Sequence, residues 1–276
     1  MERVPELLKS KIMSADQAAQ FIQTGMTIGV SGFTSVGYPK AVPEALVRSG
    51  HARDLTICVG AAVGDEIDGA MVRAGLVKKR YAHQSHKDLR NAINAGTVGY
   101  SDVHISHFPM HMNQHTGPKI DVAVVECTAV SEQGLYLAAS GGSADAAVRN
   151  ADKVIVEVNE TLPEGLVGMH DIFEIGLPPH ARIIPITKPD DRVALHTSRA
   201  RRRRSRRSFS RTAVTSRRSS SPIPRRPGPS ARTSSNSSSR RSPPAVCRRI
   251  RARSSRVSAP SATRCSAASP RAASMA

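Results

Sequence analysis

Short apolar runs alternate with amphipathic segments through roughly the first 190 residues of the chain. Runs of Val and Ile bounded by turn residues are typical of strands buried on both faces of a largely parallel sheet. The runs that predict strands are MTIGVSGF at 26–33, LTICVG at 55–60, IDVAVVE at 120–126, KVIVEVN at 153–159 and RIIPI at 182–186.

The segments between these runs carry helix signals. Ser14 followed three residues later by Gln17 is a capping-box pattern, and Gly25 ends that segment. Four more helices are expected in VPEALVRSG at 42–50, DEIDGAMVRAG at 65–75, HKDLRNAINAG at 86–96 and SADAAVRNA at 143–151. Strands alternating with helices predict an α/β fold, a largely parallel sheet flanked by helices.

Composition changes abruptly near Val193. All 22 acidic residues lie at or before Asp191, whereas residues 194–276 hold 22 Arg, 22 Ser and no Lys. The net charge is therefore −4 for residues 1–193 and +22 for the remainder. So few apolar residues occur in the second part that burial cannot offset chain entropy. We expect one folded domain, 1–193, followed by a disordered Arg/Ser/Pro/Ala-rich tail, 194–276.

The cysteines and the N-terminus bear on the compartment. Cys58 and Cys127 fall inside apolar runs, Cys247 and Cys265 fall in the tail, and none has metal-ligand spacing. The first residues, MERVPELLKSKIMSADQAAQFIQ, contain scattered charges and no apolar run long enough for a signal peptide or a membrane span. A cytoplasmic protein without membrane association is expected.

A glycine-containing segment, Ser31 to Lys40, follows the first predicted strand. In open parallel sheets, ligands bind at the carboxyl ends of strands. Gly32 and Gly37 would let backbone N–H groups approach a ligand oxygen closely, and Pro39 would fix the entry into the next helix. Spacing alone equally allows a tight turn that binds nothing, because isolated glycine patterns are weak evidence.

The segment resembles the first signature of class I coenzyme A transferases, and its form Ser-Gly-Phe-Thr-x-x-Gly-Tyr-Pro-Lys is similar to the acetyl-CoA hydrolase/transferase branch, which includes succinyl-CoA:acetate CoA-transferases. Ser31 replaces a glycine of the signature, and Thr24 stands where it has Asp or Asn. The likeness extends over residues 5–193 in co-linear blocks: Asn94-Ala95-Gly96 with Tyr100, Asp102, His104 and Ser106; IDVAVVE with Thr128 and Gly134; Ser140-Gly141-Gly142; KVIVEVN with His170-Asp171-Ile172; and IIPI with Asp191-Arg192-Val193.

This resemblance implies an enzyme that transfers CoA from an acyl-CoA to a small carboxylate such as acetate or succinate, or hydrolyses the thioester. It implies a CoA thioester as substrate, no bound cofactor, and a homodimer. The acyl group passes through a glutamate of a second domain, which lies beyond the resemblance, so no catalytic residue is assigned to this chain. The expected CoA- and substrate-binding residues are Gly32, Phe33, Thr34, Gly37, Tyr38 and Pro39, with Ser140, Gly141 and Gly142 as a second wall.

Other residues invite chemical interpretations. Glu126 could face the pocket, although an ordinary acid at a strand end is the more common case, and His104 is as well explained by a structural hydrogen bond as by a pocket role. His107, His111 and His115 recur every four residues, but Pro109 and Gly117 argue against a helix there and no metal site is expected. Asp65, Glu66 and Asp68 are interpreted as a solvated helix start.

The tail has two interpretations. As written, it resembles Arg/Ser-rich segments that bind RNA phosphates, although Phe209 is its only aromatic residue. We favour a shift of reading frame near Val193–Ala194, since regrouped codons for Cys247 to Ser266 can spell PPNPRPLQSGVGAVGNAVL, Ala194 to Arg199 can spell GTPYIP, and Ser205 to Arg211 can spell IAAIVVE. On that hypothesis the chain is truncated before the glutamate and inactive. The alternatives are a nucleic-acid-binding protein and a non-catalytic acyl-CoA-binding module.

Overall fold

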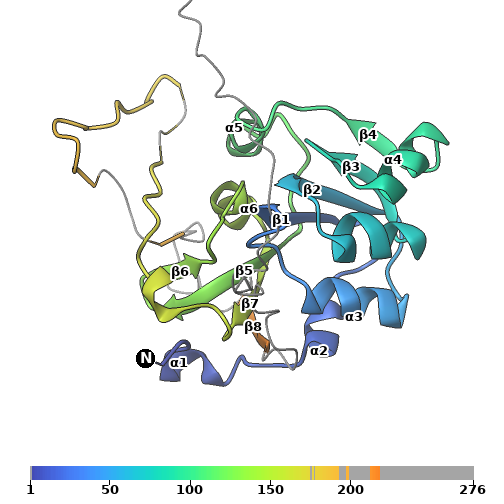
Figure 1. Ribbon diagram of the computed structural model, residues 1–276, viewed down its shortest axis with the longest axis horizontal. Helices are drawn as coiled ribbons and strands as arrows, with labels where there is room; N and C mark the ends of the chain where they lie inside the picture. The colour runs from blue at the N-terminus through green and yellow to red at the C-terminus, as the bar shows by residue number, and fades with distance from the viewer. Residues whose placement is uncertain (1, 175, 177, 193–196, 199–211, 218–276) are drawn as a thin grey trace, which may run out of the picture. The chain divides into compact units, whose positions relative to one another are not determined.

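The computed structural model describes residues 2–174, 176, 178–192, 197–198 and 212–217. Its centre is an eight-stranded sheet in the order β4-β3-β2-β1-β5-β7-β8, with β6 paired to β5 (Figure 1). Every pairing is parallel except the antiparallel pairing of β5 with β6. The predicted α/β class and largely parallel sheet are confirmed.

The elements follow one another in strict alternation over much of the chain. The strands are β1 Thr27–Thr34, β2 Leu55–Ala62, β3 Val77–Tyr81, β4 Gly99–Ser101, β5 Val122–Ser131, β6 Gly134–Leu137, β7 Lys153–Asn159 and β8 Thr212–Arg217. The helical elements are α1 Glu6–Lys9, α2 Ala15–Ala19, α3 Ala41–Ser49, the π-helix η1 Asp65–Met71, α4 Lys87–Asn94, α5 Phe108–Asn113, α6 Ala144–Asn150 and the 3₁₀ turn η2 Glu164–Leu166.

The two faces of the sheet have separate cores. Successive side chains of a strand point to opposite faces, and in β5 Val124 packs against α3 and η1 whereas Val125 packs with α5 and α6. Helices α2, α3 and α4 and the π-helix η1 contribute to the first core, and α5 and α6 to the second. The continuous Val and Ile runs therefore reflect burial on both faces, as the sequence predicted.

The strand order changes direction beside β1. The chain passes from β1 through β2 and β3 to β4, then crosses back to place β5 on the other side of β1. In open α/β sheets, ligands bind at the carboxyl edge where the order reverses, since the flanking connections leave to opposite faces there. The segment after β1 thus lies at the switch point of the sheet.

Local sequence patterns predicted the ends of several helices correctly. Ser14 and Gln17 form the expected reciprocal capping box at the start of α2. Gly50 ends α3 in the left-handed conformation. In contrast, β3, β4 and β6 were not predicted; β3 has the sequence VKKRY, whose central lysines obscure its apolar pattern.

Two predictions about local structure are wrong. Pro109 does not prevent a helix, because it lies in the first turn of α5, where its missing N–H would have no partner in any case. Residues 182–186 form no strand; the edge of β7 that could receive them is occupied by β8. That strand comes from the segment expected to be disordered, most of which lies outside the described residues.

The acidic group at the start of η1 also differs from expectation. Asp65 is exposed, but Asp68 is 1% exposed and pairs with Arg80 of β3, whose side chain is fully buried. The Arg80 guanidinium donates to both Asp68 carboxylate oxygens and to the carbonyls of Val59 and Ala62. The interpretation as a solvated helix start is therefore wrong for Asp68, because the π-helical turn directs it inward against β2 and β3.

Among the helices that the structure describes, none combines the length and apolar character needed to cross a membrane.

Candidate functional site

The segment 31–40, which begins with the last residues of β1, forms a tight turn at the switch point of the sheet. Phe33 and Val36 exchange backbone hydrogen bonds, so Thr34 and Ser35 form the tip. Thr34 has a φ of 53°, which is uncommon for a β-branched residue and costs conformational energy. Phe33 and Val36 are each 43% exposed. The turn therefore presents apolar side chains and backbone groups at the edge where a ligand is expected.

The segment packs directly against residues 140–143. Gly32 N donates to Gly141 O at 3.2 Å. A Cβ placed on Gly37 would lie 1.9 Å from Ser140 O, and one on Gly142 would lie 2.2 Å from Gly32 O. Both glycines have positive φ. The structure therefore brings together the two glycine-containing segments that the sequence singled out, and their glycines are needed for this close approach.

A buried polar network supports the segment from below. The Ser31 hydroxyl donates to Gly37 O at 2.7 Å and accepts from Glu126 N at 2.9 Å. Lys40 Nζ donates to Tyr38 O at 2.6 Å and to Glu126 Oε1 at 3.0 Å. The network joins both ends of the segment, Ser31 and Lys40, to Glu126 of β5. These hydrogen bonds hold the shape of the turn from its buried side.

Glu126 is not the ordinary strand-end acid that was the more common expectation. It lies within β5, is 2% exposed, and accepts from Lys40 and from Asn159 Nδ2 at 2.8 Å. A buried carboxylate is tolerated only when it is paired and hydrogen-bonded, as here. Its role in this structure is to hold the base of the turn.

A second buried glutamate, Glu157 of β7, is the register partner of Glu126. Its carboxylate accepts from the backbone N–H groups of Lys40 and Ala41, at 3.0 and 2.8 Å, and thereby caps the N-terminus of α3. Burial raises the pKa of this carboxyl, and the nearby Glu126 charge adds to the rise, while the backbone N–H groups oppose it.

This environment predicts a pH-dependent contribution to stability. Because the pKa of Glu157 is higher in the folded chain than its ordinary value of 4.5, the contribution is fully present below that value and is lost as pH rises through the folded pKa. Glu157→Gln cannot ionise, so its free energy of unfolding should rise relative to that of the unaltered chain as pH increases above 4.5. Urea denaturation between about pH 4 and pH 8 measures the difference.

Glu44→Gln is the control, since it removes an exposed carboxylate from the first turn of the same helix. A difference between Glu157→Gln and the unaltered chain that stays flat across this range would contradict the assigned environment.

The other predicted residues have varied positions. Tyr38 is buried, and its hydroxyl donates to Glu66 Oε2 at 2.9 Å. His104 is exposed beyond the end of β4, where its Nδ1 lies 2.8 Å from Ser106 Oγ. Three strand spacings, about 14 Å, separate β4 from β1 in the sheet. The side-chain contacts described for His104 are with Ser106 and the His107 ring and do not include the turn.

Metal-binding potential is limited in the part of the chain that the structure describes. Among the described residues, His107, His111 and His115 do not form a metal-binding cluster. The side chains close enough to share one metal ion are Asp65, His86 and Asp88. Arg73 donates to both aspartates, so its guanidinium already neutralises this exposed group. The two described cysteines are free and buried, and burial raises the pKa of the Cys58 thiol to about 12.

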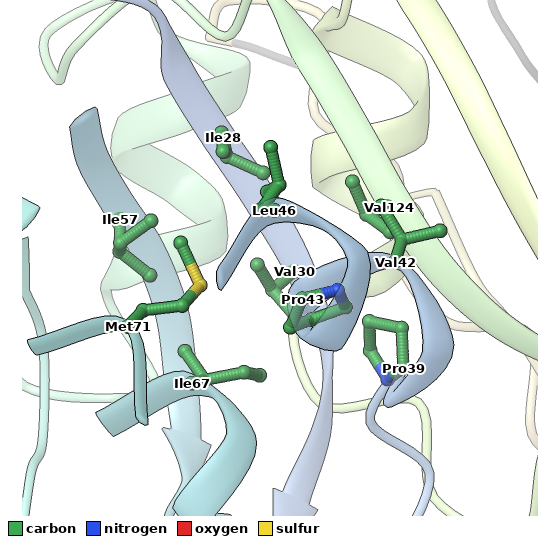
Figure 2. A pocket seen from close by; sticks show the side chains of 10 residues that line it. All are labelled: Ile28, Val30, Pro39, Val42, Pro43, Leu46, Ile57, Ile67, Met71 and Val124. Atoms are coloured by element: carbon green, nitrogen blue, oxygen red, sulfur yellow. The ribbon is translucent and has the colours of Figure 1, made fainter. Parts of the chain in front are cut away.

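A small cavity lies between α3, η1 and the sheet (Figure 2). Its volume of about 10 Å³ is near the minimum for one water molecule. Ten apolar side chains line it: Ile28, Val30, Pro39, Val42, Pro43, Leu46, Ile57, Ile67, Met71 and Val124. Pro39 links this apolar layer to the turn, so the cavity belongs to the packing beneath the site.

Sequence reasoning missed Ser31, Lys40, Glu157 and Asn159 as parts of the site. A signal for the two glutamates was present, because IDVAVVE and KVIVEVN each place one acid within a run expected to be buried on both faces. Such a charge requires a buried partner. Nothing in the local sequence indicates that Lys40 would be that partner for Glu126.

The fold is an open α/β sheet with a glycine-containing turn at its switch point, the place where proteins of this class bind ligands. The chain belongs to the acetyl-CoA hydrolase/transferase family, whose N-terminal domain matches residues 3–191.

Similar curated proteins include a succinyl-CoA:acetate CoA-transferase of Clostridium kluyveri, 40% identical over 67% of this chain and 36% of the relative. An acetyl-CoA hydrolase of Schizosaccharomyces pombe is 33% identical over 69% of this chain and 41% of the relative. The chain therefore matches well under half the length of these relatives. Glutaconate coenzyme A-transferase of Acidaminococcus fermentans aligns with 54% of this chain and 66% of that chain, at 18% identity and a TM-score of 0.46.

Proposed function

We propose that residues 1–193 are the acyl-CoA-binding domain of an acyl-CoA:carboxylate CoA-transferase of the acetate or succinate type. The observation that carries the proposal is the junction of the turn after β1 with residues 140–143 at the switch point. There the glycines let the two segments pack closely, and the exposed residues 33–36 of the turn, with the apolar side chains of Phe33 and Val36, are available for contact. Family membership supports a CoA thioester as the ligand.

Transfer to a carboxylate is favoured over hydrolysis because the 40% identical relative is named a succinyl-CoA:acetate CoA-transferase. In the proposed reaction, a glutamate carboxylate attacks the thioester carbonyl, the bond to sulfur breaks, and CoA leaves as its thiolate. The thiolate then attacks the glutamyl carbonyl of the resulting anhydride, the bond to the bridging oxygen breaks, and the donor carboxylate leaves, so that a glutamyl-CoA thioester remains. The acceptor carboxylate passes through the same steps in reverse and regenerates the free glutamate. We propose that the intact enzyme acts as a cytoplasmic homodimer without a bound cofactor.

The residues that follow Val193 bear on whether this chain is active. The composition of 194–276 does not resemble a second domain, and on the frameshift hypothesis these residues do not carry the sequence of the family's second domain. We therefore expect the 276-residue polypeptide to bind CoA without transferring it. Nucleic-acid binding by the basic tail stays a prediction, and no described contact favours it.

Calorimetric titration of the full chain with CoA tests the proposal. Phe33→Ala should raise the dissociation constant about tenfold, equivalent to about 1.4 kcal/mol, because it removes an apolar side chain from the tip of the turn. Phe21→Ala is the matched control, since Phe21 is 40% exposed just after α2 and should leave binding unchanged.

Absence of saturable CoA binding by the folded chain would contradict the proposed site. Transfer of CoA to acetate or succinate by the purified chain would contradict the expected inactivity.

A further inference from the structure

An apolar segment lies outside the sheet although its sequence is that of a strand. In RIIPI, 182–186, Ile183 is 92% exposed and Ile184 and Ile186 are also exposed. Its backbone folds locally, with Ile186 N donating to Ile184 O at 2.9 Å. Three exposed isoleucines in five residues cost hydrophobic free energy that burial at a sheet edge would recover.

The sheet has a suitable edge at β7, which β8 occupies. Thr212–Arg217 pairs in parallel with Val154–Asn159. Val214 and Thr215 are both buried, and the Thr215 hydroxyl has no hydrogen-bond partner among the described residues. A buried hydroxyl without a partner destabilises the state that contains it. The pairing of β8 with β7 therefore includes one buried polar group that lowers its stability.

Chain connectivity favours the nearer segment. A parallel partner for β7 requires a crossover of a dozen or more residues, and residues 160–181 provide one. Residues 160–211 form the much longer connection to β8, whose closure costs more chain entropy. RIIPI also offers three isoleucines to a strand, against one valine and two threonines in TAVTSR.

The proline of RIIPI has an acceptable position at this edge. Val214 N donates to Lys11 O, and Met13 N donates to Val214 O, so the Val214 backbone faces away from β7. Pro185 at that position would lose the hydrogen bond that Val214 N donates to Lys11 O, which is a cost, but it would lose no hydrogen bond to β7. Ile186 would then take the position of Thr215, replacing the unpartnered hydroxyl with an apolar side chain.

We propose that the β7 edge is a strand-acceptor site for which Arg182–Ile186 and Thr212–Arg217 compete, and that 182–186 pairs with β7 whenever 212–217 is displaced. The segment 212–217 acts as a substitute strand that keeps the isoleucines in solvent. This inference concerns the fold and does not depend on CoA binding.

Hydrogen exchange of the full chain, read by mass spectrometry on peptides covering both segments, tests the proposal. Val214→Asp places a charge at the buried position and should release 212–217. The amides of Ile184 and Ile186, which would face β7, should then exchange at least about tenfold more slowly. Leu7→Asp is the control, because it adds the same charge at an exposed position of α1 and should change neither segment.

Unchanged exchange of 182–186 in Val214→Asp, with the β1 and β5 amides still protected, would overturn the proposal. So would protection that grows with protein concentration, which would indicate pairing with a second copy. If Val214→Asp does not fold, Ala213→Pro replaces it, because it removes the N–H that faces β7 without adding charge. Slower exchange of 182–186 in that variant would support the proposal. Unchanged exchange, or protection that grows with protein concentration, would overturn it.

Discussion

Asp68→Ala is expected to lower the free energy of unfolding by about 3–5 kcal/mol, the usual cost of removing one partner from a buried ion pair. Arg80 is fully buried and would keep its charge without a counter-ion. Its remaining contacts are backbone carbonyls such as Val59 O and Ala62 O, which do not neutralise it. Urea or guanidinium denaturation of the full chain measures the loss.

Two matched variants sharpen this prediction. Asp68→Asn keeps an oxygen that can accept from Arg80 Nε and should cost less than Asp68→Ala. Asp16→Ala breaks the exposed pair with Arg48 and should cost under about 1 kcal/mol. Equal effects of Asp68→Ala and Asp16→Ala would show that the Arg80–Asp68 pair does not brace β2 and β3 as described.

Gly37→Ala is expected to disrupt both the stability of the turn and its binding of CoA. A left-handed conformation costs a non-glycine residue about 1–2 kcal/mol. The new Cβ would also lie 1.9 Å from Ser140 O, so backbone must shift, at a further cost of about 1–3 kcal/mol. We expect denaturation to report the summed loss and calorimetry to report at least a tenfold weaker affinity for CoA.

Gly25→Ala separates the two causes. Gly25 has a φ of 81°, similar to the 74° of Gly37, but no atom lies within 4 Å of its added Cβ. It should therefore show the conformational cost alone and leave CoA binding unchanged. If Gly37→Ala behaves like Gly25→Ala in both measurements, the close packing against Ser140 is not required for the site.

The parts of the fold predicted from sequence are those encoded by local patterns. The reciprocal cap of Ser14 and Gln17, the left-handed Gly50 and the runs that became β1, β2, β5 and β7 each depend on neighbouring residues. Register, partner choice and edge occupancy depend on residues distant in sequence. For this reason 182–186 was predicted as a strand although β8 holds that edge.

The candidate site divides in the same way. The glycines of the turn and of residues 140–143 were identifiable because conformational freedom is a property of the residue type. The contacts of Lys40 with Glu126 and of Glu157 with the start of α3 join segments more than eighty residues apart. His104 was identified within a family block, yet it follows β4, which lies at the far end of the sheet order.

Ser31 gives the switch point a property that a glycine there would not supply. The pairing of β1 with β5 ends at Val30 and Val124, so the two strands separate just where the turn begins. Beyond that point the Ser31 hydroxyl accepts a hydrogen bond from the Glu126 N–H and donates one to Gly37 O. The side chain thus bridges the two strands where their backbone pairing has ended, so that they diverge without leaving the Glu126 N–H unsatisfied.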